Sequence, residues 1–175
     1  MTPVRWVLDP EITPRLREEL AGLWSEVVEA GGAVGFPPGT GPAGVLPELD
    51  RHLAGIGAGT TRLLLGVDEA GGPAATAFIV HTGHALMGHW VWLKTVMVRP
   101  AAQGAGAGRE LMAEAERAIR GFGGIRAIRL TCRGGMGLER FYAACGYKEV
   151  GRVPDAIAVG GGELRDDVMM WRPLD

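Results

Sequence analysis

The sequence has few cysteines, no long apolar run and no excess of charge of either sign. Two cysteines, Cys132 and Cys145, are too few for the disulfide framework of a small secreted protein, so we expect free thiols in a cytoplasmic protein. No stretch approaches the roughly 18 apolar residues of a membrane span, and the first residues lack a secretion pattern. A net charge of -2 leaves no basic surface for nucleic acid.

The remaining composition is typical of one folded domain. The chain has 175 residues, of which 47% are hydrophobic and 22% are charged, so it can bury a core and is not expected to be disordered. We therefore treat residues 1–175 as a single domain. Glycine occupies 29 positions, so a glycine motif must be judged by its spacing.

A glycine-rich turn joins an apolar strand to an amphipathic helix within residues 96–109. Gly104, Gly106 and Gly108 leave room for backbone N–H groups to approach an anion. The first turn of the following helix adds unpaired N–H donors and the positive end of the helix dipole. The turn therefore predicts a pyrophosphate site made by the backbone.

Three nucleotide-binding motifs and a flexible Gly/Ala linker compete as explanations of this turn. A Walker loop ends in Gly-Lys-Ser/Thr, but this turn ends in Gly108 and Arg109, with no hydroxyl for magnesium. A dinucleotide fingerprint needs wider glycine spacing and an acid about 20 residues later, near residue 128, where none stands. The spacing Gln103-x-x-Gly106-x-Gly108 resembles the acetyl-CoA loop of the GNAT superfamily of N-acetyltransferases.

A second signature follows at residues 138–147. A short helix carries Phe141 and Tyr142, ends at Gly146 and is followed by Tyr147, which is similar to the Phe-Tyr helix of the same superfamily. Gly135 stands where that superfamily usually has Asn. An amphipathic helix and an alternating strand fill the space between the two signatures. On these motifs the chain is identified as a member of the superfamily over residues 90–152.

The order of elements along the chain predicts a mixed α/β (α+β) fold. The resemblance implies the GNAT fold, with a mixed, mostly antiparallel seven-stranded sheet flanked by about four helices. Thr13 is an expected N-cap with Pro14 behind it, and Pro47 is expected to lead the second helix. The expected strands cover residues 4–8, 62–68, 74–82, 89–98, 125–132, 147–158 and 165–172, and the expected helices cover residues 14–30, 46–55, 109–120 and 138–146.

The resemblance also implies acetyl-CoA as the cosubstrate. In this fold the strand before the turn splays from its neighbour, so that its backbone pairs with pantetheine. Tyr142 would then protonate the CoA thiolate as an amine attacks the thioester directly; the alternative is a core tyrosine that packs beside Phe141. The expected cofactor-binding residues are Met97, Val98, Gln103, Gly104, Ala105, Gly106, Ala107, Gly108 and Arg109.

The sequence leaves the general base open and indicates no metal site. No acid lies on the strand 89–98, where His89 and Lys94 are the only titratable groups. His89 could relay a proton, but a histidine at a strand end is more often structural, so the base stays unassigned. His81, His84 and His89 lack the Cys or acid that would complete a metal-binding set.

The acceptor site is expected in two irregular segments, residues 31–38 and 153–167. Both segments are similar to parts of the tabtoxin-resistance acetyltransferases, and the similarity implies a small amine-bearing acceptor, such as an antibiotic or toxin. Phe36 and Asp155 are the predicted substrate-binding residues, with Asp155, Glu163, Asp166 or Asp167 as the acid that holds the ammonium.

Other interpretations of function remain open. The acceptor could instead be a protein N-terminus or a lysine, or the chain could be a non-catalytic acyl-CoA-binding module, which the Gly at position 135 and the missing base would favour. The strand 165–172 is apolar enough to pair across a homodimer or to belong to the core.

Overall fold

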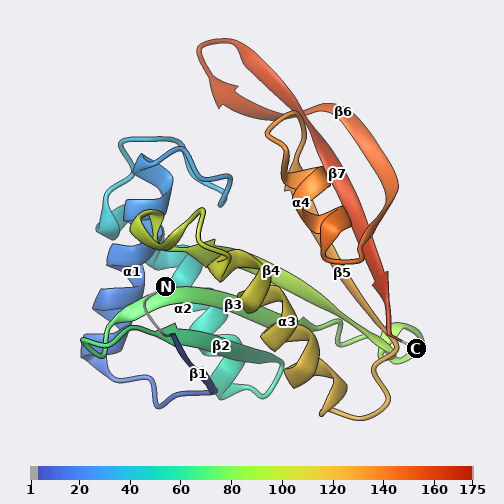
Figure 1. Cartoon of the computed structure of the whole chain (residues 1–175), viewed down its shortest axis with the longest axis horizontal. Helices are drawn as coiled ribbons and strands as arrows, with labels where there is room; N and C mark the ends of the chain where they lie inside the picture. The colour runs from blue at the N-terminus through green and yellow to red at the C-terminus, as the bar shows by residue number, and fades with distance from the viewer. Residues whose placement is uncertain (1–3, 175) are drawn as a thin grey trace.

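A mixed sheet forms the centre of the molecule, as the computed structural model of residues 4–174 shows (Figure 1). Among these residues the sheet has seven strands in the order β1-β2-β3-β4-β5-β7-β6, and every neighbouring pair is antiparallel except β4 and β5. The predicted fold class is thereby confirmed. The strands are β1 (Arg5–Leu8), β2 (Thr61–Val67), β3 (Pro73–His81), β4 (Trp90–Val98), β5 (Ala127–Arg133), β6 (Lys148–Gly160) and β7 (Glu163–Pro173).

Helices cover both faces of this sheet. The helices are α1 (Pro14–Glu29), α2 (Pro42–Gly57), α3 (Ala107–Arg120) and α4 (Leu138–Ala144), with short 3-10 turns η1 (Ala85–Met87) and η2 (Pro100–Ala102). On one face, α1 and α2 bury leucines and Trp24 against β2, β3 and Met97. On the other face, α3 buries Leu111, Ala115 and Ile119 against β3, β4 and β5. The predicted order of elements is confirmed.

The first helix begins where its capping residues predict. The side chain of Thr13 accepts a hydrogen bond from the backbone N–H of Leu16 at 3.1 Å, and Pro14 occupies the first turn. Seven residues of α1 are buried, at the helical spacing that the sequence shows. The helix is thus fixed by a local cap at its start and by one apolar face along its length.

The second helix is longer than predicted. We expected it to begin near residue 46 with Pro47 leading it, but α2 begins at Pro42 and contains Pro47 in its interior. Proline lacks the N–H that would bond to the carbonyl four residues earlier, which is that of Ala43. Ala43 is exposed, so water can hydrate this carbonyl, and the helix tolerates the proline. The extra turn places Val45 in the core.

The two central strands, β4 and β5, are paired over only three residues. Trp90, Val91 and Trp92 of β4 pair with residues 127–129 of β5, and the pairing then stops. Figure 1 shows the two halves of the sheet diverging from this end, with β1–β4 in one half and β5–β7 in the other. This arrangement confirms the splayed central strand that the resemblance implies. The edge of β4 that faces β5 is left without a strand partner beyond Trp92 within the described residues.

Strand β4 also carries a bulge. Thr76 of β3 pairs with Met97, whereas Phe78 pairs with Lys94, so the register shifts between these two pairs. Thr95 lies at the shift and has a φ of +48°, a left-handed conformation that β-branched residues rarely adopt. The bulge therefore turns the local backbone away from a regular strand.

The last two strands form a long hairpin. The expected strands at residues 147–158 and 165–172 are present, but β6 continues to Gly160 and β7 begins at Glu163, so most of the segment 153–167 that we expected to be irregular is strand. Three glycines with positive φ, Gly160, Gly161 and Gly162, make the reversal, and bulges along β6 absorb the proline and the irregular spacing. None of the described helices is both long and apolar enough to cross a membrane.

Candidate active site

Two cavities meet beside the diverging strands. The first, which we call the glycine-loop groove, has a volume of about 710 Å³ and lies between the end of α1, the edge of β4, the loop before α3 and the helix α4. The second, the aromatic cavity, has a volume of about 450 Å³ and lies between α1, α2, β4 and β5. Five residues line both cavities: Ala33, Val34, Val96, Leu138 and Tyr142.

Glycines shape the loop at the far end of the groove. Gly104 and Gly106 have φ values of +79° and +94°, and Gly106 is the N-cap of α3. No side chain caps this helix, so the N–H groups of its first turn remain available to an anion. The side chain of Gln103 donates a hydrogen bond to the carbonyl of Val98 at 2.9 Å, which ties the loop to the end of β4.

Gly108 allows two helices to approach each other in the same region. A Cβ placed on this residue would lie 3.3 Å from the ring of Phe141 on α4, which is tighter than ordinary packing. Helix α3, which follows the loop, and helix α4, which carries Tyr142, are therefore held close together. Arg109 follows on the exposed side of α3 and lines the groove.

The edge of β4 forms one wall of the groove. Met97 and Val98 pair with Thr76 and Ala75 of β3 on one side, and no strand pairs with them on the other. Their backbone groups on the open edge therefore need a hydrogen-bonding partner, either water or an extended ligand. This edge and the glycine loop together suit a chain-like ligand that ends in a pyrophosphate.

Tyr142 lies where the two cavities join. Its side chain comes from α4 and packs edge-on against Phe141, with ring centroids 5.1 Å apart, and against Tyr147, at 5.9 Å. Only 7% of the residue is exposed, and burial raises the pKa of its phenol well above the ordinary value, so the hydroxyl keeps its proton. Within residues 4–174 no protein group forms a hydrogen bond with that hydroxyl, which leaves it available to a ligand.

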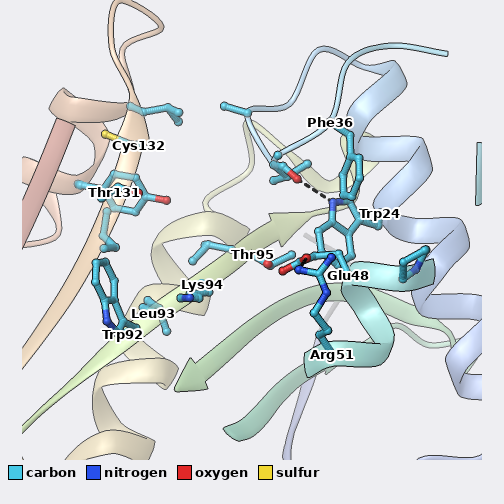
Figure 2. Close-up of a pocket in the computed structure, with 18 of the residues that line it drawn as sticks. Trp24, Phe36, Glu48, Arg51, Trp92, Leu93, Lys94, Thr95, Thr131 and Cys132 are labelled. Carbon is cyan, nitrogen blue, oxygen red and sulfur yellow. Dashed lines mark hydrogen bonds and ion pairs between the residues drawn. The ribbon is translucent and has the colours of Figure 1, made fainter. Parts of the chain in front are cut away.

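Aromatic side chains border the second cavity on two sides. Trp24 and Phe36 meet edge-to-face with ring centroids 5.5 Å apart, and Trp92 of β4 stands on the opposite side (Figure 2). Cys132 of β5 also lines the cavity, and burial raises the pKa of its thiol to about 12. A thiol that stays neutral is a poor nucleophile, so Cys132 contributes shape to the cavity and no charge.

Charged side chains face this cavity from two elements. Glu48 and Arg51 come from α2 and form an ion pair of 2.5 Å. Lys94 comes from β4, and its ammonium lies 5.6 Å from the ring centroid of Trp92 (Figure 2). No described carboxylate lies within ion-pair distance of Lys94. The cavity therefore offers a small polar ligand the carboxylate of Glu48 and the ammonium of Lys94, which has no described carboxylate partner.

A buried histidine stands behind the cavity wall. His52 of α2 stacks on Phe78 with ring centroids 4.4 Å apart, and only 7% of the residue is exposed. Its Nε2 lies 3.3 Å from the hydroxyl of Thr95, which lines the cavity, and 3.9 Å from a carboxylate oxygen of Glu48. Burial lowers the pKa of His52, the charges of Lys94 and Arg51 lower it further, and Glu48 acts in the opposite direction.

The structure brings most of the predicted cofactor residues together. Met97, Val98, Gln103, Gly104, Gly106, Gly108 and Arg109 all line the groove. Ala105 of the loop and Ala107, the first residue of α3, do not line the groove; Ala105 is exposed, and Ala107 is buried.

The two predicted substrate-binding residues do not lie in the same site. Phe36 lines the aromatic cavity, whereas Asp155 is exposed on β6, where its backbone N–H donates to a carboxylate oxygen of Asp166. Asp155 lines neither cavity, so its role stays a prediction without support from position. The sequence did not indicate Glu48, Arg51 or His52, because nothing in the spacing of a surface helix shows which cavity it borders.

His89 is exposed before β4 and lines neither cavity. Across residues 4–174, no three His, Cys, Asp or Glu side chains come close enough together to hold a metal ion. The polar chemistry of the described site thus rests on Tyr142, on the Glu48, His52 and Thr95 group, and on Lys94.

Comparison with known proteins gives a family and a fold. A family model described as the acetyltransferase (GNAT) family matches residues 40–147. A phosphinothricin acetyltransferase of the GNAT superfamily from Sinorhizobium meliloti, solved in complex with AcCoA, is 18% identical and has a TM-score of 0.79, covering 99% of this chain and 89% of its own.

Two further structures share the fold. A ribosomal-protein-alanine N-acetyltransferase from Brucella melitensis is 19% identical, with a TM-score of 0.75, over 96% of this chain and 99% of its own. A spermidine N-acetyltransferase chimera from Vibrio cholerae and hSSAT is 16% identical, with a TM-score of 0.71, over 96% and 94%. The acceptors named for these three structures differ, so the shared fold does not by itself identify an acceptor.

Proposed function

The chain belongs to the acetyltransferase (GNAT) family, and from this premise we propose that it transfers the acetyl group of acetyl-CoA to the amine of a small molecule. The observation that carries the proposal is the position of Tyr142. Its unpartnered hydroxyl lies where a groove suited to a cofactor meets a cavity suited to an acceptor.

Acetyl-CoA fits the glycine-loop groove by the chemistry of its lining. The glycine loop and the uncapped start of α3 supply N–H donors for the pyrophosphate, and the positive φ of Gly104 and Gly106 permits the close backbone approach. The open edge of β4 at Met97 and Val98 offers backbone groups to the amides of pantetheine. Bound this way, the thioester lies toward the end of the groove that Tyr142 and Val96 border.

Transfer then needs one proton for the leaving group. The acceptor nitrogen attacks the thioester carbonyl, a C–N bond forms and the C–S bond breaks. The departing thiolate takes the phenolic proton of Tyr142, which burial keeps in place at neutral pH. A positioned O–H group stabilises the developing thiolate better than bulk water does, because it needs no reorientation.

The aromatic cavity suits a small acceptor. Its volume of about 450 Å³ is that of a small-molecule site, and Trp24, Phe36 and Trp92 supply apolar walls. Glu48 is placed to bind an ammonium group, and Lys94 is placed to bind an anionic substituent of the same molecule. An antibiotic or toxin that bears an amine would satisfy these features, and a role in detoxification in the cytoplasm is part of the proposal.

A protein N-terminus or lysine is the second candidate acceptor, because one structure of the same fold is named for a ribosomal-protein alanine. A non-catalytic acyl-CoA-binding module is the third interpretation. The aromatic side chains on opposite sides of the cavity and its volume of about 450 Å³ favour the small molecule, since a peptide needs a trench in which its chain can continue.

The experiment that separates these functions has two parts. Calorimetric titration with acetyl-CoA tests the groove, and release of CoA is then followed with phosphinothricin, spermidine and an alanine-terminated peptide as acceptors. Fastest release with one of the two small amines supports the proposal, and fastest release with the peptide replaces it with protein acetylation. Tight binding of acetyl-CoA without release by any amine supports the binding module.

A homodimer is a separate part of the proposal. Of the four apolar residues expected to pair across an interface, Val168 and Met170 are core residues, while Met169 and Trp171 are half-buried on the other face of β7. Val150, Val153 and Leu164 add exposed apolar surface on the same hairpin. Light scattering of the protein and of a Val153→Glu variant tests it, because a dimer through this hairpin should dissociate in the variant.

A further inference from the structure

We propose that Thr95 and His52 together accept the proton that the acceptor amine must lose, with the Thr95 hydroxyl receiving it and passing its own proton to Nε2 of His52. The inference rests on the proposed function and supplies the base that the sequence leaves unassigned. It is carried by the position of Thr95, by the burial of His52 and by the 3.3 Å contact between them.

Thr95 occupies the position where an acceptor amine would meet the thioester. It lines the aromatic cavity, and the next residue, Val96, lines both this cavity and the glycine-loop groove. Figure 2 shows Thr95 between the side chains from α2 and those from β4 and β5. Thr95 therefore lines the same cavity as Tyr142 and is adjacent in the chain to a residue of the junction.

The backbone of Thr95 is held in an unfavourable conformation to achieve this. Its φ of +48° lies in the left-handed region, where a β-branched side chain is strained, and glycine would fit without strain. The bulge in β4 imposes this conformation and aims the Thr95 side chain at His52. A strained, non-glycine residue that keeps its hydroxyl on a buried imidazole indicates that the hydroxyl is used.

His52 has the environment of a proton acceptor. Phe78 of β3 stacks on its ring, Trp24 of α1 lies 6.2 Å from it, and burial keeps the imidazole neutral near pH 7 by lowering its pKa. The tautomer with its proton on Nδ1 leaves Nε2 free to accept from Thr95.

The charges around His52 come from two elements. Glu48, whose carboxylate lies 3.9 Å from Nε2, favours the imidazolium that forms when a proton arrives. Arg51 of the same helix and Lys94 of β4 disfavour it, so that the proton can leave again. Among the described residues, no charged group of another element shifts the pKa of His52.

The proton balance of the step is complete. A bound ammonium gives one proton to Thr95 Oγ1 as the Thr95 proton moves to His52, and the nitrogen becomes a neutral nucleophile. When the C–N bond forms and the C–S bond breaks, the CoA thiolate takes the Tyr142 proton. The surplus proton of the new amide nitrogen restores Tyr142 through solvent, and His52 releases the first proton to solvent, so one proton is produced per turnover.

Three variants of Thr95 and His52 test the route, with phosphinothricin as the acceptor, or whichever amine of the panel releases CoA fastest. Thr95→Ser keeps the hydroxyl and should retain kcat within a few-fold. Thr95→Gly removes the hydroxyl but also removes the φ strain, so it should fold at least as stably as wild type and yet lose about 100-fold in kcat, the usual contribution of a positioned base.

The pH dependence of kcat/KM in His52→Gln distinguishes a proton acceptor from a merely structural residue, because loss of packing would not change its shape. Wild-type kcat/KM should fall as pH decreases through the pKa of His52, which burial holds below its ordinary value, because the imidazole then becomes protonated. The variant should lose this acidic limb while it keeps the alkaline limb of the amine itself. Affinity for acetyl-CoA and the unfolding temperature are measured in parallel to show that each variant is folded.

The outcomes separate the inference from the proposed function. If Thr95→Gly retains the rate of Thr95→Ser, or if His52→Gln keeps the acidic limb, the proton takes another route and the inference is wrong while acetyl transfer stands. If wild type binds acetyl-CoA but acetylates no amine at any pH, the proposed function fails and the inference fails with it.

Discussion

The indole N–H of Trp24 donates a hydrogen bond to the carbonyl oxygen of Val34 across 2.9 Å, drawn as the dashed line in Figure 2. This bond joins the buried face of α1 to the segment that follows the helix. Val34 borders both the glycine-loop groove and the aromatic cavity. One buried indole thus fixes the segment that both ligands would contact.

Replacing Trp24 by Phe should loosen that segment. The variant loses one hydrogen bond and part of a buried ring, which together cost about 1–3 kcal/mol of unfolding free energy. We expect KM for the acceptor to rise about 5- to 10-fold, measured by steady-state CoA release. Trp171→Phe, a matched change on β7 away from both cavities, should lose stability without changing KM; equal KM shifts in the two variants would contradict the role assigned to Trp24.

The Gly106→Val variant should lose acetyl-CoA binding. Gly106 has a φ of +94°, so a branched side chain costs about 1–2 kcal/mol of strain and also crowds the N–H donors at the start of α3. Calorimetry should show at least a 10-fold weaker Kd. Gly71 provides the control, because its φ of +84° imposes a similar strain far from the groove; Gly71→Val should lose stability and keep its affinity.

Tyr142→Phe should lower kcat by about 10²- to 10⁴-fold, the range of general acid catalysis, with little change in the Kd of acetyl-CoA. The buried ring stays in place, so the loss reports the hydroxyl alone. Tyr147→Phe removes the same group from the neighbouring buried ring, which lines neither cavity, and should keep wild-type kcat. A wild-type rate for Tyr142→Phe at saturating substrates would exclude the phenol as the acid.

Lys94→Gln should select against acceptors that carry an anionic group. A charge-assisted hydrogen bond contributes about 1.5–3 kcal/mol, so KM for an amino acid acceptor should rise about 10-fold or more, while KM for its carboxamide should not change. The comparison uses CoA release with the two acceptors side by side. The chain has one other lysine, Lys148, which is exposed on β6, and Lys148→Gln should leave both KM values unchanged.

Stability should fall at mildly acidic pH because of His52. Its pKa in the folded protein lies below the ordinary 6.5, so as pH drops below 6.5 the unfolded chain takes up a proton that the folded chain resists. The free energy of unfolding therefore decreases as pH falls through the pKa of the folded state, and is fully retained above 6.5. Urea titrations of wild type and His52→Gln should show a shallower decrease in the variant, and a variant at the exposed His84 should follow wild type.

The sequence predicted the elements whose ends carry local signals. Thr13 and Pro14 mark the start of α1, and the glycine turn marks the start of α3, because caps and positive-φ glycines act within a few residues of themselves. The sequence predicts the start of helix α2 four residues too late, since Pro42 and Pro47 are equally good first-turn residues by type. Only the exposure of Ala43, a property of the folded chain, permits the second proline inside the helix.

The candidate site also has a part that local sequence signals predict and a part that only the folded chain brings together. The glycine loop and the strand edge of the groove come from one contiguous segment, residues 96–109, so the spacing within that segment indicates Gln103, Gly106 and Gly108. The acceptor cavity is assembled from α1, α2, β4 and β5, and the presence of Glu48 and Lys94 in the same cavity depends on how α2 packs across the sheet. For the same reason the sequence offers candidate bases only on the strand β4 itself and does not indicate the partner of Thr95, which lies on a helix 43 residues earlier.

The three residue pairs between β4 and β5 join the two halves of the sheet at one end, and the halves form two arms that diverge from this end. The aromatic cavity has Trp24 and Glu48 on one arm and Thr131, Cys132 and Tyr142 on the other, so its width follows the angle between the arms. A cofactor lodged between the arms acts as a spacer that sets this angle. The acceptor cavity would then reach its working width only after the spacer is in place, and the two substrates should bind in a compulsory order, with acetyl-CoA first.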